Sequence, residues 1–175
     1  MDSARATRVI FIGGRSGSGK TTVAAAASRI LAGRDVRHAV IEGDNLDQAH
    51  PEPWRAGIDL AEQNLAAMWS NYRRAGYHRL LFTNTVSVAQ IDGLSRALGG
   101  EVEARGVLLT ADDETVSDRL RRREFGAAAA VHIDRSRRAA AELDALDIAI
   151  RIATDGRAPA DIAHALLTET GWLDE

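Results

Sequence analysis

The 175-residue chain carries a formal net charge of −3 and has a pI near 6.0, which excludes a general attraction to nucleic acids or anionic membranes. It contains no cysteine, so disulfides, thiolate metal sites and a cysteine nucleophile are excluded as well. No apolar stretch approaches the roughly 18 residues that span a bilayer, and the first residues lack the apolar core of a signal peptide. These features predict a cytoplasmic protein without a membrane or nucleic-acid partner.

Strand and helix patterns alternate along the whole chain. In chain order we predict a strand over residues 7–12, a helix over 21–31, a strand over 38–41, a helix over 58–75, a strand over 79–82, a helix over 88–98, a strand over 102–109, a helix from 112, a helix over 133–143, a strand over 148–152 and a helix over 159–168. The small residues from Gly126 to Ala130 predict a loop between the two helices of the fourth crossover.

This alternation predicts βαβ units, and therefore a three-layer αβα sandwich around a five-stranded parallel sheet. We find no internal repeat and no linker composition, so we expect a single domain over residues 1–175. The small-residue segment lies within a predicted lid near residues 124–138.

The segment from Gly14 to Thr21 matches the pattern G-x-x-x-x-G-K-[ST] without departure. Glycines allow consecutive backbone N–H groups to wrap a phosphate, and the following helix N-terminus favours an anion. Lys20 is the only lysine among 22 basic residues. Its compact ammonium can follow the β- and γ-phosphate oxygens, for which a planar guanidinium has a different geometry, while the Thr21 hydroxyl is positioned for Mg²⁺. The sequence therefore predicts nucleotide binding.

This loop, together with Gly43-Asp44-Asn45 after the second strand, resembles the small-molecule kinases of the P-loop superfamily. The branches it resembles are gluconate kinase, adenylylsulfate kinase and chloramphenicol phosphotransferase. The resemblance implies a nucleoside-monophosphate-kinase-like architecture, ATP and Mg²⁺ as cofactors, and a small hydroxyl-bearing substrate.

Asp44 is the first candidate for the acceptor side, because ligands of parallel sheets bind outside the carboxyl ends of the strands. In the resembled kinases, the acid at this position contacts the acceptor hydroxyl or the metal shell. The alternative is that Asp44 only caps the helical turn at Leu46. The third strand is followed by Asn84 and Thr85 and carries no carboxylate, which disfavours a motor ATPase or a switch GTPase.

The proline-flanked segment from His50 to Arg55 predicts a stiff loop that presents His50, Trp54 and Arg55, either to a substrate or to solvent. It does not match the acceptor loops of the gluconate or adenylylsulfate kinases, so the acceptor stays unidentified.

Arg119 and Arg123 lie four residues apart, on one face of the predicted helix before the lid. The resemblance implies that Arg119 stacks on the base and that Arg123 reaches the phosphates. The alternative is a solvated cationic face. Arg135, Arg137 and Arg138 follow, and spacing does not select which of them closes on the phosphates. The turn from Thr154 to Arg157 resembles the adenine-edge turn of these kinases.

The predicted function is transfer of the γ-phosphoryl group of ATP to a hydroxyl of a metabolite or antibiotic, by a monomer or homodimer. A nucleoside or nucleotide kinase is one alternative, and a nucleotide-binding regulatory or nucleic-acid-associated module is another. The predicted catalytic residues are Lys20, Asp44 and Arg123, and the predicted metal ligand is Thr21. The predicted nucleotide-binding residues are Gly14, Arg15, Ser16, Gly17, Ser18, Gly19, Lys20, Thr21, Thr22, Arg119, Arg123 and Arg157.

Overall fold

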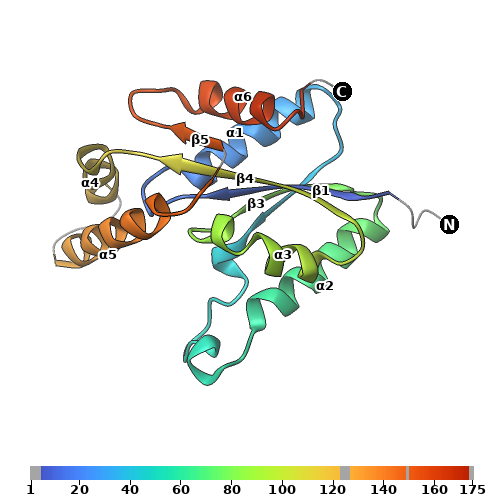
Figure 1. Cartoon of the computed structure of the whole chain (residues 1–175), viewed down its shortest axis with the longest axis horizontal. Helices are drawn as coiled ribbons and strands as arrows, with labels where there is room; N and C mark the ends of the chain where they lie inside the picture. The colour runs from blue at the N-terminus through green and yellow to red at the C-terminus, as the bar shows by residue number, and fades with distance from the viewer. Residues whose placement is uncertain (1–4, 123–126, 149, 174–175) are drawn as a thin grey trace.

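The computed structural model describes residues 5–122, 127–148 and 150–173, which form one parallel sheet between layers of helices (Figure 1). The strands are β1 (Thr7–Gly13), β2 (Ala39–Glu42), β3 (Arg79–Thr83), β4 (Val102–Thr110) and β5 (Ile150–Ala153), in the spatial order β2-β3-β1-β4-β5. The helices are α1 (Lys20–Gly33), α2 (Leu60–Arg74), α3 (Ile91–Leu98), α4 (Asp113–Arg121), α5 (Ala127–Asp144) and α6 (Pro159–Glu169). Three 3-10 turns are η1 (Gly43–Asn45), η2 (Pro53–Ala56) and η3 (Ser87–Ala89). The predicted αβα sandwich is confirmed.

β1 is the central strand because its side chains are apolar on both faces. Val9, Ile10, Phe11 and Ile12 are all fully buried. A continuous apolar run of this kind is typical of parallel strands that are covered on both sides. β1 pairs in parallel with β3 on one side and with β4 on the other, so the loop after β1 begins in the middle of the sheet.

The helices divide into two layers (Figure 1). α1 and α6 cover one face, where alanines of α1 pack against Ile10, Leu81 and Leu109. α2 and α3 cover the other face, where Leu65 and Trp69 pack against Phe11 and Phe82. α4 and α5 lie beside each other at the carboxyl edge of the sheet. Within the three described ranges, no helix combines the length and the apolar character that a bilayer crossing requires.

The prediction of a loop over the alanine run is wrong for Ala127–Ala130, which are the first residues of α5. Alanine has the highest intrinsic helix propensity, so four alanines in succession extend a helix. Gly126 lies outside the described residues, and so do residues 123–125, including Arg123. The predicted lid from 127 onward is thus helical.

The strand register brings the chain's polar strand ends to one edge. Ile12 of β1 is level with Thr83 of β3, and Thr83 is level with Glu42 of β2. On the other side, Thr110 of β4 is level with Ala153 of β5. Because all five strands run in the same direction, the loops that follow them converge at this carboxyl edge.

Replacing Trp69 tests the packing of the α2 layer. Trp69 is fully buried, and its Nε1 donates a hydrogen bond to Thr7 Oγ1 at 3.1 Å. We expect Trp69→Ala to lower the free energy of unfolding by about 3–5 kcal/mol, because a large cavity and an unpaired hydroxyl remain. The neighbouring Met68 is 38% exposed, so Met68→Ala is the matched control and should cost less than about 1 kcal/mol. Urea unfolding of both variants measures the difference, and equal losses would contradict this account of the core.

Candidate active site

The loop between β1 and α1 has the shape of a phosphate cradle. Gly14, Gly17 and Gly19 adopt φ values of 146°, 86° and 96°. A side chain at Gly14 would be impossible, because its Cβ would lie 2.6 Å from both the Leu109 carbonyl oxygen and Ser18 Oγ. Gly14 is therefore required by its close approach to β4 as well as by its backbone conformation, and Gly19 is favoured by its positive φ.

Lys20 lies at the start of α1 and points back into this loop. Its ammonium donates hydrogen bonds to the Gly14 carbonyl at 2.8 Å and to the Arg15 carbonyl at 3.2 Å. The side chain is 8% exposed. The ammonium is thus held over the loop by two backbone oxygens, at the position that the motif predicts.

Two further observations fit a bound phosphate. Ser18 Oγ is buried and has no hydrogen-bond partner in the structure. The N-terminus of α1 has Gly19 as its N-cap and no side-chain cap, so its first-turn N–H groups are not closed off by a side chain. A phosphate oxygen is an acceptor for such N–H groups and for a hydroxyl, and the helix dipole favours its charge. Thr21 follows on the first turn, and its side chain is exposed.

On one side of the loop, the structure brings Asp44 and Asn84 together. Asp44 lies in η1 after β2, Asn84 follows β3, and Asn84 Nδ2 donates to Asp44 Oδ1 at 3.0 Å. The Asn84 side chain is itself oriented by the Val86 N–H, which donates to Asn84 Oδ1 at 2.9 Å. η1 has no side-chain cap, so the Asp44 carboxylate is directed at Asn84 and is exposed at the carboxyl edge.

On the other side, Arg119 of α4 joins the loop to the end of β5. Its guanidinium donates to the Gly17 carbonyl at 3.1 Å, and to Thr154 through Oγ1 at 3.1 Å and the carbonyl at 3.2 Å. Arg119 therefore lies between the phosphate loop and the turn from Thr154 to Arg157, which the sequence assigned to the adenine edge. Its guanidinium is held in place by backbone and hydroxyl oxygens.

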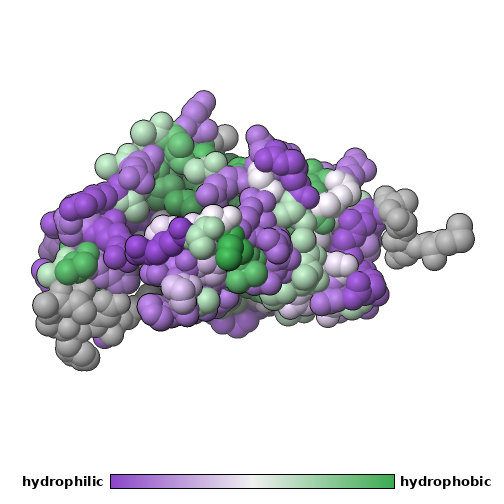
Figure 2. All heavy atoms as spheres, turned by 90° about the horizontal axis from the view of Figure 1, so that it is seen from below, coloured by the Kyte–Doolittle hydropathy of each residue, from purple (hydrophilic) through white to green (hydrophobic). Residues whose placement is uncertain are grey.

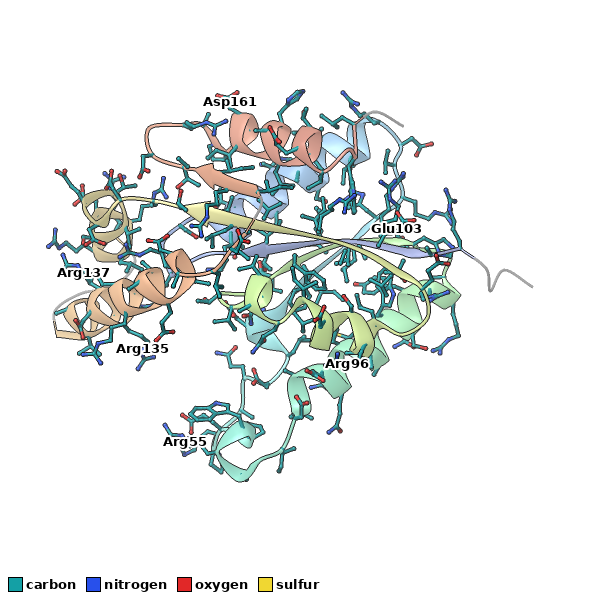
Figure 3. The ribbon with its side chains drawn as sticks, viewed as in Figure 1. Arg55, Arg96, Glu103, Arg135, Arg137 and Asp161 are labelled. Carbon is teal, nitrogen blue, oxygen red and sulfur yellow. The ribbon has the colours of Figure 1, made fainter. Side chains whose placement is uncertain are left out.

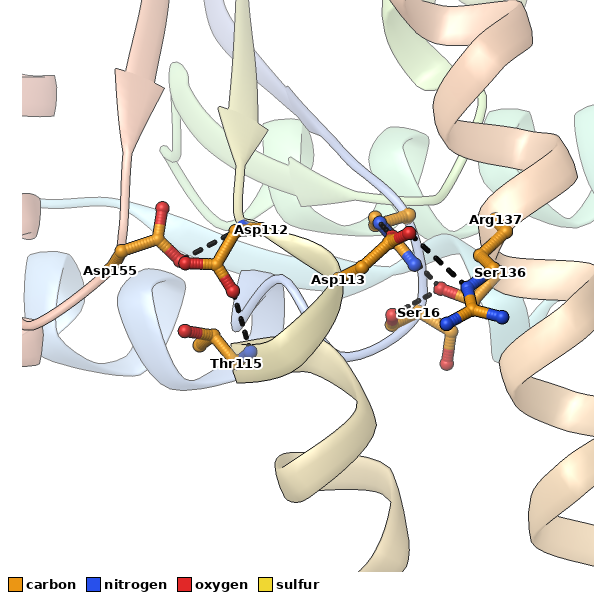
Figure 4. Close-up of polar contacts among 8 residues, drawn as sticks. Ser16, Asp112, Asp113, Thr115, Ser136, Arg137 and Asp155 are labelled. Carbon is orange, nitrogen blue, oxygen red and sulfur yellow. Dashed lines mark hydrogen bonds and ion pairs between the residues drawn. The ribbon is translucent and has the colours of Figure 1, made fainter.

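The turn after β5 is bonded to the start of α4. Asp155 Oδ1 accepts a hydrogen bond from the Asp112 N–H at 2.9 Å, and Asp112 Oδ1 accepts one from the Thr115 N–H at 2.6 Å (Figure 4). The Thr115 bond is the main cause that lowers the pKa of the Asp112 carboxyl. Arg157 donates to the carbonyls of Ala153 at 3.1 Å and Asp161 at 3.5 Å, and so braces the turn into α6.

The sequence did not predict what the Arg15 side chain does. As a residue of the loop, Arg15 is predicted to bind the nucleotide. Its guanidinium instead points toward α4 and α5, and the residue is only 5% exposed. Arg15 Nε donates to Ser136 Oγ at 2.9 Å, and Arg15 NH1 contacts Asp113 Oδ1 at 2.5 Å. Ser136 Oγ in turn donates to the Ser16 carbonyl at 2.8 Å (Figure 4). The loop is thus tied to both α4 and α5.

Asp113 also accepts a contact from Arg137 Nε at 3.2 Å. The hydrogen bond from Arg15 is the main cause that lowers the pKa of the Asp113 carboxyl, and the charge of Arg137 adds to it. Of the three arginines that spacing could not separate, Arg137 is the one that reaches this network (Figures 3 and 4). Arg138 instead pairs with Asp134 at 2.7 Å on the exposed face of α5.

The segment with His50, Trp54 and Arg55 projects away from the sheet (Figure 3). Trp54 is 60% exposed and stacks against the Arg55 guanidinium, whose carbon lies 4.8 Å from the ring centroid. Arg55 also pairs with Glu52 at 3.1 Å. From the side of α2, α3 and α5, the surface is mainly hydrophilic, with small apolar patches (Figure 2). The contacts of Trp54 and Arg55 are thus local, with each other and with Glu52.

The comparisons with known proteins agree with this fold. A family model described as an AAA domain matches residues 9–146. A comparison with curated proteins found no match. Among solved structures, a gluconokinase from Sinorhizobium meliloti is similar with a TM-score of 0.62 and 21% identity, over 97% of this chain and 94% of that one.

Two other solved structures are similar over nearly their whole length. A tunicamycin resistance protein from Deinococcus radiodurans has a TM-score of 0.64 and 20% identity, over 94% of this chain and 96% of that one. An APS kinase from Mycobacterium tuberculosis, solved with AMPPNP and APS, has a TM-score of 0.57 and 18% identity, over 98% of this chain and 99% of that one. These likenesses show a shared fold.

The Asp113 network gives a pH-dependent prediction. The pKa of Asp113 is lower in the folded protein than its ordinary value of 3.8, so the ionised carboxylate stabilises the fold above that pH and ceases to do so as the pH falls through the folded pKa. We expect Asp113→Asn to be less stable than the parent at pH 7, with a difference that begins to shrink as the pH falls below about 3.8 and is lost as the pH falls through the lower pKa of the folded state. Urea unfolding between pH 3 and 7 measures this.

The control is Asp118→Asn, because Asp118 pairs with Arg121 at 3.7 Å on an exposed surface. We expect this variant to differ little from the parent across the same range. A difference between parent and Asp113→Asn that persists unchanged to pH 3 would contradict the role given to the ionised carboxylate.

Proposed function

The chain belongs to the AAA domain family, and from that premise we propose that it is an ATP- and Mg²⁺-dependent phosphotransferase, which moves the γ-phosphoryl group to a hydroxyl of a small metabolite or antibiotic. The observation that carries the proposal is the Asp44–Asn84 hydrogen bond of 3.0 Å, which joins the carboxyl ends of β2 and β3 on one side of the phosphate loop. A carboxylate placed there is suited to orient a hydroxyl and to accept its proton.

The sheet order supports separate places for donor and acceptor. β1 carries the phosphate loop, β3 and β2 on one side end at Asn84 and Asp44, and β4 and β5 on the other end at α4 and Thr154. An acceptor molecule bound at the β2–β3 side and the nucleotide's adenine bound at the β4–β5 side would have the phosphates between them. In-line phosphoryl transfer needs this arrangement, because catalysis depends mainly on positioning and charge stabilisation.

ATP with Mg²⁺ supplies the transferable phosphoryl group and neutralises its charge when bound. Within the chain, Lys20 and the loop N–H groups hold the phosphates, and the exposed Thr21 hydroxyl is placed to contact the metal. Arg119 lies against the loop and the Thr154 turn, where it can pack on the base with its orientation already set by four hydrogen bonds.

The residues directly after β3 include no carboxylate, so this part of the proposed acceptor side is neutral. The strand ends at Thr83 and is followed by Asn84 and Thr85, which are neutral hydrogen-bonding residues. Two of the similar solved structures are named as a gluconokinase and an APS kinase, and the latter was solved with AMPPNP and APS. These names support a small-molecule acceptor, and the substrate itself is a matter for a screen.

That screen measures ADP release with a library of hydroxyl compounds, which includes sugars, sugar acids, nucleosides, nucleoside monophosphates and hydroxylated antibiotics. The Lys20→Ala protein is the blank for spontaneous hydrolysis. Acceptor-dependent ADP release that the blank lacks is the expected result. Activity confined to nucleosides or nucleoside monophosphates would replace the proposal by a nucleotide kinase.

Lys20→Ala tests the phosphate site. The ammonium is held over the loop, so its loss removes a positive charge from the transferring phosphoryl group. We expect phosphotransfer to fall by at least about 10³-fold, while circular dichroism and the unfolding midpoint stay near those of the parent. Phosphotransfer close to the parent's rate would overturn the proposal.

Asp44→Asn tests the acceptor side. The variant keeps the size of the side chain and removes its charge and basicity. We expect kcat to fall by about 10²–10⁴-fold with little change in KM for ATP. Asp47→Asn, three residues further along the same segment, is the matched control and should keep kcat. If ATP affinity falls instead while kcat is preserved, Asp44 has a structural role only.

A further inference from the structure

We propose that a cleft at the amino end of the sheet binds a small phosphorylated anion, at a site separate from the phosphate loop. The cleft has a volume of about 440 Å³ and lies where β1 and β3 begin and where the chain enters β2. Its charged and titratable lining residues are Arg5, Arg8, Asp35, Arg37, His78 and Arg79. The proposed phosphotransfer does not use these residues.

The charge of the cleft is opposite to that of the whole protein. Four guanidinium groups line it, and Asp35 is the one carboxylate among the lining residues that the structure describes. Glu103 adds a second negative charge beside the cleft, because its carboxylate lies 3.3 Å from Arg8 Nε. Figure 3 shows Glu103 at the end of the molecule away from Arg137. Positive groups therefore outnumber negative ones among the described residues that line this cleft, in a protein whose formal net charge is −3.

Aromatic rings orient the arginine side chains of the cleft. The Arg37 guanidinium carbon lies 5.8 Å from the centroid of the Tyr77 ring. Arg8 and Arg79 lie against Trp172, at 6.0 and 5.8 Å from its ring centroid, and Trp172 is only 2% exposed. A ring fixes the plane of a guanidinium without cancelling its charge, so the group stays attractive to an anion.

Gly76 makes room for the Arg37 side chain. A Cβ at this position would lie 2.8 Å from Arg37 NH1, and Gly76 has a φ of 84°. Gly76, which follows the C-cap residue Ala75 of α2, thus lets a guanidinium lie directly against the backbone. Arg37 is itself exposed, so it can contact a ligand from the rim of the cleft.

The chemistry of these groups selects the ligand. Guanidinium forks match the oxygens of phosphate, and several forks around one cleft neutralise more than one charge. A volume of about 440 Å³ admits a diphosphate-bearing small molecule. The cleft is distinct from the phosphate loop. The cleft lies at the start of β1 and the loop follows its end, and the seven residues of β1 separate these two positions by roughly 20 Å.

Isothermal titration with pyrophosphate tests the proposal. The titration uses Lys20→Ala protein, so that the phosphate loop contributes little, and compares it with Lys20→Ala/Arg37→Ala. We expect pyrophosphate to bind the first protein and to bind the second about tenfold more weakly or not at all. Lys20→Ala/Arg121→Ala is the matched control, since Arg121 is a 66% exposed arginine on α4, and it should bind as the first protein does.

Three results would overturn the proposal. The first is no pyrophosphate binding to the Lys20→Ala protein, and the second is binding that Arg37→Ala leaves unchanged. The third is equal affinity for tricarballylate, which would show a site for any multiply charged anion and not for phosphate. A single-stranded oligonucleotide that binds far more tightly than pyrophosphate, with a steep salt dependence, would assign the surface to nucleic acid instead. Because the Lys20→Ala background removes the loop's contribution, failure here leaves the proposed phosphotransfer untouched.

Discussion

The burial of β1 on both faces determines where the chemistry of this protein can occur. Its four apolar side chains are fully covered, so the strand must lie inside the sheet, and its pairing with β3 and β4 leaves it in the centre. The loop that follows is then placed between two pairs of strand ends. Asp44 and Asn84 come from one pair, and the start of α4 and the Thr154 turn come from the other. This strand order leaves one edge position on either side of the loop for the donor and acceptor sites that we propose.

A buried arginine makes the phosphate loop part of a larger unit. Removing a guanidinium from water is unfavourable unless partners replace the lost hydrogen bonds. Ser136 and Asp113 satisfy Nε and NH1 of Arg15, whereas its NH2 is buried without a hydrogen-bond partner. An apolar residue in its place could pack equally well, so stability alone does not explain it. The bonds join the loop to α4 and α5, and Ser136 returns a bond to the Ser16 carbonyl. The positions of α4 and α5 and the shape of the loop are therefore linked through these hydrogen bonds.

Much of the fold and the glycine loop around Lys20 could be predicted from the sequence, because both depend on local signals. Hydrophobic period and glycines predict the sheet and the loop, whereas the hydrogen bond between Asp44 and Asn84 joins two strand ends 40 residues apart and is seen only in the structure. The Arg15 network could not be predicted, since 98 and 121 residues separate Arg15 from Asp113 and Ser136, and the motif leaves position 15 unspecified. The prediction of a loop over the alanine run is wrong for a different reason. Small residues are compatible with a loop, but alanine also has a high helix propensity, and here it forms the start of α5. Arg123 lies outside the described residues, so its role stays a prediction.

The two basic side chains of the loop show why arginine and lysine are not interchangeable here. Arg15 spreads its planar fork between a hydroxyl and a carboxylate, and this geometry fixes its direction away from the cradle. Lys20 concentrates its charge in one ammonium that two carbonyl oxygens hold over the loop. An ammonium has three donors around a single centre, so it can keep contact with backbone oxygens while it contacts a phosphate. Every other basic residue counted as Lys or Arg is arginine. The single lysine thus stands where a compact charge that can bond in several directions is needed. Arginine stands in the same loop where a planar group must hold two neighbouring elements in a fixed geometry.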